Sequence, residues 1–270
     1  MIAGKTWREL RWLALAYLLI LEALTIPVLL LWPEIYADLQ RSTLLKQLGI
    51  DFLKRIGEGV SSRDEDVAYI NWCAVMLFFR GANLVGTAAA VLFGTGLFAR
   101  ERENQTLEFL LARPVSRPHL LWHKFWPAAV CVVVPLFLVN ASAIFWSRCI
   151  DLDLPKWPLF LATVHAAVFA LAFLSATTWI SIVLRVQAHV AAVIGAFAVV
   201  EIGVYLTQRI RQFSLFHLAD FEWYGPILAG NVTPRDMFDP IGSQGFTTWL
   251  LAAVVVLYAL ALRSLRRVEP

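Results

Sequence analysis

Three ionisable residues stand inside long apolar stretches of this sequence and are the first candidates for chemistry. Glu22, Arg80 and Glu201 are each flanked by runs of aliphatic and aromatic residues. If these runs lie in a membrane, each charge costs at least about 2.5–3.5 kcal/mol, so it usually faces a charged partner or a wet path. At 1.5 Å per helical residue, all three fall at a similar depth. We expect either a structural ion pair of Arg80 with Glu22 or Glu201, or a polar lining for a substrate.

The other residue types that carry chemistry form no recognisable catalytic or metal site. His119 and His123 would share one face of a helix, but two histidines without a third ligand favour a surface pair over a metal site. The three cysteines form no CxxC pair, and the sequence contains no GxxxxGK[ST] phosphate loop, HExxH or GxSxG motif. We therefore expect a chain that is not an enzyme and holds no cofactor of its own.

Composition indicates a membrane protein. Hydrophobic residues make up 59% of the 270 residues and charged residues only 16%, against about 25% in soluble domains. Six apolar stretches approach or exceed the roughly 20 residues that a helix needs to cross a bilayer, and the alternation typical of barrel strands is absent. The sequence thus predicts an all-α membrane protein, with a single transmembrane domain over residues 1–270. Its predicted spans are 12–32, 70–98, 125–146, 157–184, 190–206 and 246–262.

Charge near the span ends predicts the orientation. With the amino terminus inside, basic residues outnumber acidic ones in the inner segments, and the reverse holds for the outer segments. The positive-inside rule then places both termini in the cytoplasm and the chain in the cytoplasmic (inner) membrane as a multi-pass protein. The long outer loop 33–69 carries apolar residues at helical spacing, and loop 207–245 is rich in Trp, Tyr, Pro and Gly. Short amphipathic or re-entrant outer helices are expected in both loops.

Small residues recur on one face of two predicted spans. Ala82, Gly86, Ala90 and Gly94 are each four residues apart in the second span, and Ala191, Gly195 and Gly203 form a similar row in the fifth. Such rows let another helix backbone approach closely. Packing within the chain and dimerisation explain them equally well.

The densest run of charge lies between the second and third spans. It reads "ERENQTLEFLLARPVSRPHLLWHKF" and begins at Glu101. Thr106 is a candidate N-cap, with Glu108 in the first turn to complement the helix dipole. Pro114 ends the helix because proline lacks a backbone donor and restricts the residue before it. The sequence therefore predicts a short amphipathic helix on the cytoplasmic surface, tied to a span at each end.

This run resembles the signature of type-2 ABC transporter permeases, which has the form E-R-E-x-G-T-L-E-x-L-L-x-x-P-V-S-R followed by six residues and a lysine. Gln105 replaces the usual glycine. The resemblance implies a cytoplasmic coupling helix at this place, seated in a groove of a separate ATPase subunit. The positions that it assigns to this coupling are Glu101, Glu103, Thr106, Leu107, Glu108, Leu110, Leu111, Pro114, Ser116 and Arg117.

The resemblance further implies a dimeric permease subunit, or one of a permease pair, that works with two ABC ATPase subunits. ATP and Mg²⁺ would bind in those partners, and membrane lipids would surround the spans; no nucleic acid is expected. The leading hypothesis is export of a substrate across the cytoplasmic membrane, weakly favouring amphipathic or lipid-like cargo. The alternative is a mechanotransmission or scaffold subunit that acts on an extracytoplasmic partner and transports nothing.

Overall fold

The computed structural model describes residues 2–41, 51–107, 115–242 and 245–268, and within these ranges the chain is helical and without strands. Six helical segments are long and apolar enough to cross a membrane, which confirms the six predicted spans. Five are single helices: α1 (Ile2–Leu30), α9 (Arg117–Arg148), α10 (Lys156–Val183), α11 (Gln187–Leu206) and α14 (Phe246–Arg267). The second span is built from α5 (Glu65–Cys73), η1 (Ala74–Val85) and α6 (Gly86–Thr95), with α7 (Ala99–Glu103) after it.

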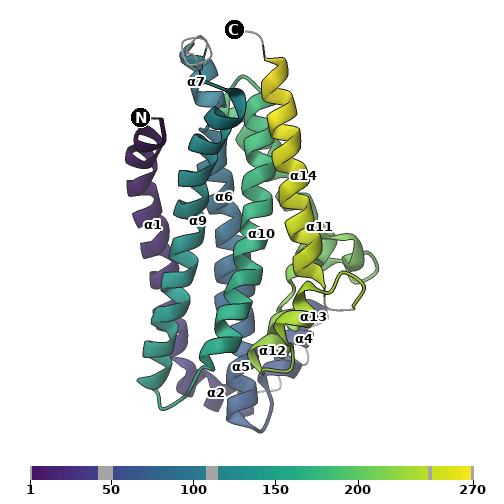
Figure 1. Cartoon of the computed structure of the whole chain (residues 1–270). Coiled ribbons are helices and arrows are strands. Elements are labelled where there is room, and N and C mark those ends of the chain that lie inside the picture. The colour runs from purple at the N-terminus through teal and green to yellow at the C-terminus, as the bar shows by residue number, and fades with distance from the viewer. Residues whose placement is uncertain (1, 42–50, 108–114, 243–244, 269–270) are drawn as a thin grey trace.

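The spans form an upright bundle with two distinct ends (Figure 1). Both chain ends and α7 lie at one end, which we call the termini end. The opposite end, here the loop end, carries the short helices of the two long loops. These are α2 (Trp32–Arg41), α4 (Asp51–Val60), α12 (Phe221–Leu228) and α13 (Pro234–Phe238). The second loop also contains η2 (Arg211–Phe213) and η3 (Leu215–Ala219), nearer the middle of the bundle, where Phe216 packs on Phe169 and Phe173 of α10.

The small residues of the second span serve packing within the chain. A Cβ added at Gly94 would lie 2.7 Å from Cβ of Thr177 on α10, closer than side chains ever approach. A Cβ at Gly86 would lie 3.3 Å from the hydroxyl of Tyr17 on α1. These two glycines therefore let α6 fit tightly between α10 and α1.

The small residues of the fifth span do not pack on the chain's own helices. A Cβ added at Gly195 or Gly203 meets no atom within 4 Å. Val199, between them on the same row, is 69% exposed. This face of α11 is therefore open to lipid or to another chain.

The second span is not a uniform α-helix, which the sequence did not indicate. Its central stretch η1 is a π-helix of 12 residues that includes Arg80 and Asn83. Hydrogen bonds in a π-helix run from i to i+5, and such segments occur mostly as short insertions at functional sites. The prediction of this span assumed 3.6 residues per turn throughout, and a change in helix type leaves no mark on hydropathy.

The loop end contains the predicted short helices, and one of them is deeply buried. In α12, Trp223, Tyr224 and Ile227 are almost fully buried, because this helix packs against η1 and α10. In the first loop, Ile56 and Val60 of α4 face the bundle, whereas the apolar residues 44–48 lie outside the described ranges. The amino-terminal residues continue directly into α1 and form no separate helix.

Candidate functional site

The signature run begins at the turn where the second span ends. Helix α6 ends at Thr95, a turn follows, and α7 leads to Leu107. Residues 108–114 lie outside the described part of the chain, and with them Glu108, Leu110, Leu111 and Pro114. The coupling helix itself thus remains a prediction, whereas the structure describes the contacts of α7 and α9, the helices before and after it.

A Schellman motif ends α7. The backbone N–H of Thr106 donates to the carbonyl of Glu101 at 2.8 Å, and the N–H of Gln105 donates to the carbonyl of Arg102 at 3.0 Å. Gln105 occupies the left-handed position of this motif, with φ of 56°. Glycine is the residue that usually takes this position. The turn is therefore retained although Gln105 replaces the glycine of the signature.

Replacing Gln105 by glycine is expected to stabilise the chain slightly. The left-handed conformation costs a non-glycine residue roughly 1–2 kcal/mol, and the greater freedom of glycine in the unfolded chain offsets part of this. Thermal unfolding in detergent should show Gln105→Gly equal to or above the wild type. Gln105→Ala is the control, because it keeps the strain. An alanine variant as stable as the glycine variant would contradict this account.

A buried ion pair fastens α7 to α9. Nζ of Lys124 lies 2.5 Å from Oε2 of Glu101 and donates to the carbonyl of Leu97 at 2.6 Å. The two charged side chains are only 5% and 12% exposed, and Nζ of Lys5 approaches Glu101 from α1 at 3.8 Å. Glu101 and Lys124 are the first and last charged residues of the signature. The structure thus gives Glu101, a predicted coupling position, an internal supporting contact.

The next two signature residues connect α7 to the turn between α10 and α11. Nη1 of Arg102 donates to the carbonyl of Val183, the last residue of α10, at 3.2 Å. The N–H of Gln187, the first residue of α11, donates to Oε2 of Glu103 at 3.4 Å. A cation at a helix C-terminus and an anion at an N-terminus both match the helix dipole. Arg102 and Glu103 therefore hold the connection between α10 and α11 against α7.

Four further predicted coupling residues belong to the described ranges, on either side of residues 108–114. Leu107 is buried, and Thr106 is exposed with its hydroxyl donating to the carbonyl of Glu101 at 3.2 Å. The amides that a Thr106 N-cap would bind lie outside the described ranges. Ser116 is the N-cap residue of α9 but makes no capping hydrogen bond with its side chain, and Arg117 begins the helix.

Each of the three intramembrane charges has polar partners of its own. Ser142 on α9 donates to Oε2 of Glu22 at 2.9 Å, whereas Nη2 of Arg80 donates to the backbone carbonyl of Leu24 at 3.3 Å. Oε2 of Glu201 accepts the N–H of Leu215 at 2.7 Å. Within the described ranges no ion pair joins Arg80 to either acid, so the expected pairing is not formed. Glu22 of α1 thus contacts α9, whereas Arg80 of η1 contacts the backbone of α1.

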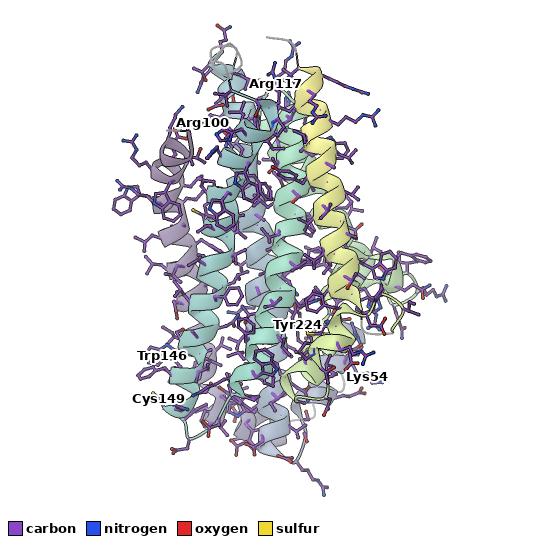
Figure 2. The ribbon with its side chains drawn as sticks, viewed as in Figure 1. Lys54, Arg100, Arg117, Trp146, Cys149 and Tyr224 are labelled. Atoms are coloured by element: carbon purple, nitrogen blue, oxygen red, sulfur yellow. The ribbon has the colours of Figure 1, made fainter. Side chains whose placement is uncertain are left out.

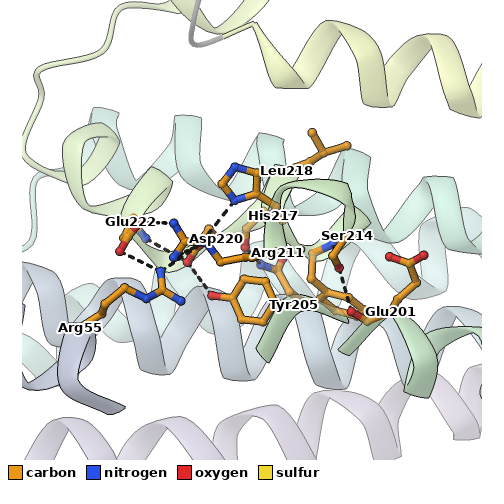
Figure 3. A network of polar contacts seen from close by, with 12 residues as sticks. Arg55, Glu201, Tyr205, Arg211, Ser214, His217, Leu218, Asp220 and Glu222 are labelled. Carbon is orange, nitrogen blue, oxygen red and sulfur yellow. Dashed lines mark hydrogen bonds and ion pairs between the residues drawn. The ribbon is translucent and has the colours of Figure 1, made fainter. Parts of the chain in front are cut away.

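A charged cluster at the loop end was not predicted from the sequence (Figure 3). Asp220 is its centre and is 2% exposed. Its carboxylate accepts from the hydroxyl of Tyr205 at 2.7 Å and from Nη1 of Arg55 at 3.3 Å, and Nη1 of Arg211 lies 3.9 Å away. We call the whole set the loop-end cluster: Arg55, Tyr205, Arg211, His217, Asp220 and Glu222.

The loop-end cluster joins elements that are distant in the sequence. Arg55 belongs to α4, whereas Asp220 and Glu222 lie at the start of α12, 165 and 167 residues further along. Burial alone would lower the pKa of Arg55, but the hydrogen bond to Glu222 and the charge of Asp220 raise it overall. Arg55 thus remains charged, and its contacts with Asp220 and Glu222 hold the first long loop against the second. Isolated charges in two loops carry no sequence signal for such a contact.

Comparison with known proteins agrees with the resemblance in the signature run. A family model described as "ABC-2 family transporter protein" matches residues 8–214, from α1 to the residue before η3. The chain belongs to this ABC-2 family. A search of curated proteins found no match. The family and the six spans make this chain an integral membrane permease, of a kind that pairs with another permease and with ABC ATPase subunits.

A second polar group holds η3 and α12 inside this ABC-2 permease. Nε2 of His165 on α10 donates to the carbonyl of Leu218 at 2.9 Å, which leaves Nδ1 to accept from the hydroxyl of Thr247 at 2.7 Å. Asn83 of η1 donates to the carbonyl of Ala219 at 2.7 Å and accepts from Tyr224 at 3.0 Å. These hydrogen bonds satisfy buried backbone groups and give His165 a structural role.

Metal binding finds no support in the part of the permease that the structure describes. No group of three or more His, Cys, Asp or Glu side chains is placed there to hold an ion. The rings of His119 and His123 lie 4.0 Å apart on α9, as their spacing predicted, with no third ligand among the described residues.

Proposed function

We propose that this chain is the permease subunit of an ABC exporter, that it works as a pair, and that two separate ATPase subunits drive it from the termini end. Its membership of the ABC-2 family and its six spans support a permease role. The sequence lacks a phosphate loop, so ATP and Mg²⁺ would bind in the partner subunits. The lack of that motif fits a division of labour between two kinds of chain.

The attachment of α7 is the observation that carries this proposal. Glu101 connects α7 to α9, Arg102 connects it to the end of α10, and Glu103 connects it to the start of α11. A displacement of residues 108–114 would therefore act on three spans at once, because each contact is a charged hydrogen bond or ion pair. Such an arrangement suits a segment that receives force from a docked ATPase.

Charge supports a cytoplasmic location for the termini end. Basic residues near the ends of the spans gather there, and Arg100 and Arg117 are labelled at this end in Figure 2. Lys and Arg favour the cytoplasmic side of a membrane protein. We propose that the chain lies in the inner membrane of the cell. In this orientation the predicted coupling segment would face the cytoplasm, where an ATPase could bind it. The other described basic residues at this end are Lys5, Arg8, Arg11, Arg102, Lys124, Arg185, Arg263, Arg266 and Arg267.

The open face of α11 supports the pairing of two permease chains. Gly195 and Gly203 leave room for close approach of another backbone, and Val199 lies exposed between them. Rows of small residues are typical of interfaces between transmembrane helices. We propose that a second copy, or a related permease subunit, packs on this face.

The charge of Arg80 inside the second span favours an amphipathic substrate. Arg80 is a cation in the second span that neither Glu22 nor Glu201 neutralises. Intramembrane charges without a counterion usually face a substrate path or water. We therefore propose that Arg80 faces the path between the paired chains, where it would favour cargo that carries a negative group on an apolar body.

Charge reversal at Glu103 tests the coupling. Glu103→Arg places a cation at the N-terminus of α11 and beside Arg102, so the connection between α7 and α11 is lost. We expect the permease-dependent ATPase rate of the reconstituted complex to fall at least about tenfold, which corresponds to about 1.4 kcal/mol of activation free energy. The permease itself should remain folded and should still purify as a membrane protein.

Glu34→Arg is the matched control, because Glu34 is exposed on α2 at the loop end. It should leave the ATPase rate unchanged. If no ATPase subunit co-purifies with the wild type, or if Glu103→Arg retains the full permease-dependent rate, the coupling proposal fails.

A further inference from the structure

A cavity with a charged lining lies at the termini end, between α1, the end of α6, α7 and α9. Its volume is about 270 Å³, and Lys5, Glu9, Arg100, Glu101 and Lys124 supply its charged lining. This volume is smaller than a site for a whole drug-sized ligand, which usually measures about 300–1,000 Å³. The cavity therefore suits a compact polar group.

The charges of the cavity favour an anion. Its lining holds three cations against two acids. The acids are already engaged: Glu101 pairs with Lys124 at 2.5 Å, and Glu9 lies 3.9 Å from Lys5. The guanidinium of Arg100 makes no ion pair among the described residues and carries the unbalanced positive charge. An incoming phosphate would therefore find Arg100 available, whereas Lys5, 3.9 Å from Glu9 and 3.8 Å from Glu101, would be shared with these two acids.

An apolar surface continues from the charged end of the cavity. Leu13 of α1 and Leu92 of α6 line the cavity and are 38% and 58% exposed. Both belong to helices that are long and apolar enough to cross a membrane, so their exposed side chains suit contact with hydrocarbon. A ligand that fills the cavity with its polar group would lay an apolar chain against these leucines. Charge and apolar surface are thus arranged in the order that they have in a phospholipid.

We propose that this cavity binds an anionic phospholipid, with the phosphate at Arg100 and Lys5 and an acyl chain along Leu13 and Leu92. The site adjoins α7, whose Glu101 lines it directly. Lipid bound there contacts both α1 and the support of the coupling segment. The proposal does not depend on the identity of the transported substrate or on the coupling to an ATPase.

Native mass spectrometry of the full chain in detergent tests this proposal. The probes are phosphatidylglycerol and phosphatidylcholine of the same acyl chains, titrated separately. We expect the first bound phosphatidylglycerol to bind more tightly than phosphatidylcholine. Arg100→Ala should weaken it about fivefold, because a basic residue contributes about 1 kcal/mol to binding of anionic lipid. Arg100→Lys should retain most of the affinity.

Two further variants and a competitor distinguish a lipid site from general surface attraction and from a site for a soluble phosphate compound. Arg266→Ala removes an exposed cation of α14 at the same end that does not line the cavity, and it should have no effect. Leu92→Trp keeps every charge but alters the apolar surface, and it should weaken phosphatidylglycerol severalfold. Glycerol 3-phosphate, which has the polar group without acyl chains, should not compete at equal concentration.

Three results would overturn the proposal. One is equal affinity of the wild type for both lipids. Another is an equal loss of affinity in Arg100→Ala and Arg266→Ala, which would show general surface attraction. The third is full competition by glycerol 3-phosphate, which would identify the cavity as a site for a soluble phosphate compound.

Discussion

Replacing Asp220 with alanine is expected to lower the free energy of unfolding by about 3–5 kcal/mol, because it removes the buried acid between two arginines. The Asp220 carboxylate lies 3.3 Å from Nη1 of Arg55 and 3.9 Å from Nη1 of Arg211, and it accepts from Tyr205 at 2.7 Å. It also accepts the N–H of Glu222 at the start of α12. Denaturant titration of the purified chain in mixed micelles measures the change.

Glu222→Ala is the matched control for this prediction. Glu222 contacts the same two arginines, at 2.7 and 3.6 Å, but its side chain is 45% exposed against 3% for Asp220. Exposed ion pairs contribute only about 0–1 kcal/mol. Asp220→Asn should fall between the two, since it removes the charge and keeps an oxygen for the cap. Equal destabilisation by Asp220→Ala and Glu222→Ala would show that burial does not decide the strength of this cluster.

Replacing Glu101 with glutamine is the second change with a large expected effect. It removes the carboxylate that pairs with Lys124 and leaves the buried ammonium with neutral acceptors, the new amide oxygen and the carbonyl of Leu97. Breaking a buried ion pair in this way typically costs about 3–5 kcal/mol. Lys124→Met should cost less, because Glu101 retains Lys5 at 3.8 Å and is more exposed. Thermal unfolding of both variants in the same detergent tests this order.

The double variant Glu101→Leu/Lys124→Met separates pairing from packing. Replacing a buried pair by apolar side chains is often close to neutral, so the double variant should be more stable than Glu101→Gln alone. Glu9→Gln serves as the exposed control, since Glu9 is 46% exposed and lies 3.9 Å from Lys5. A double variant less stable than Glu101→Gln would contradict the view that an unpaired charge causes the loss.

The spans could be predicted from the sequence because a long apolar run has only one stable form in a bilayer, a helix. The signature run could be placed at a membrane surface because it is charged and lies between two such apolar runs. The pair of Glu101 and Lys124 could have been predicted: both belong to the signature, and Lys124 is the last charged residue before the apolar run of α9. From the sequence, Glu101 was assigned to contact with a partner subunit, and its internal contact was overlooked.

Other features could not be predicted, because they depend on contacts between distant segments. Nothing local connects Arg55 to Asp220, and no spacing indicates that His165 meets the carbonyl of Leu218. The expected pairing of Arg80 rested on depth alone. Depth says nothing about direction around a helix, and Glu22 faces Ser142 whereas Arg80 contacts the backbone at Leu24.

The π-helical stretch gives the second span a way to move that a regular helix lacks. The hydroxyls of Tyr69 and Ser147 lie 2.5 Å apart near its loop end, and α7 is tied to α9 at the other end. Between these two fixed points, η1 takes up more residues per turn than an α-helix would. Transfer of one residue from this stretch into α6 would rotate the intervening side chains by about 100°. We therefore expect the second span to respond to force by twisting about its own axis, which would reorient Arg80 while both ends stay in place.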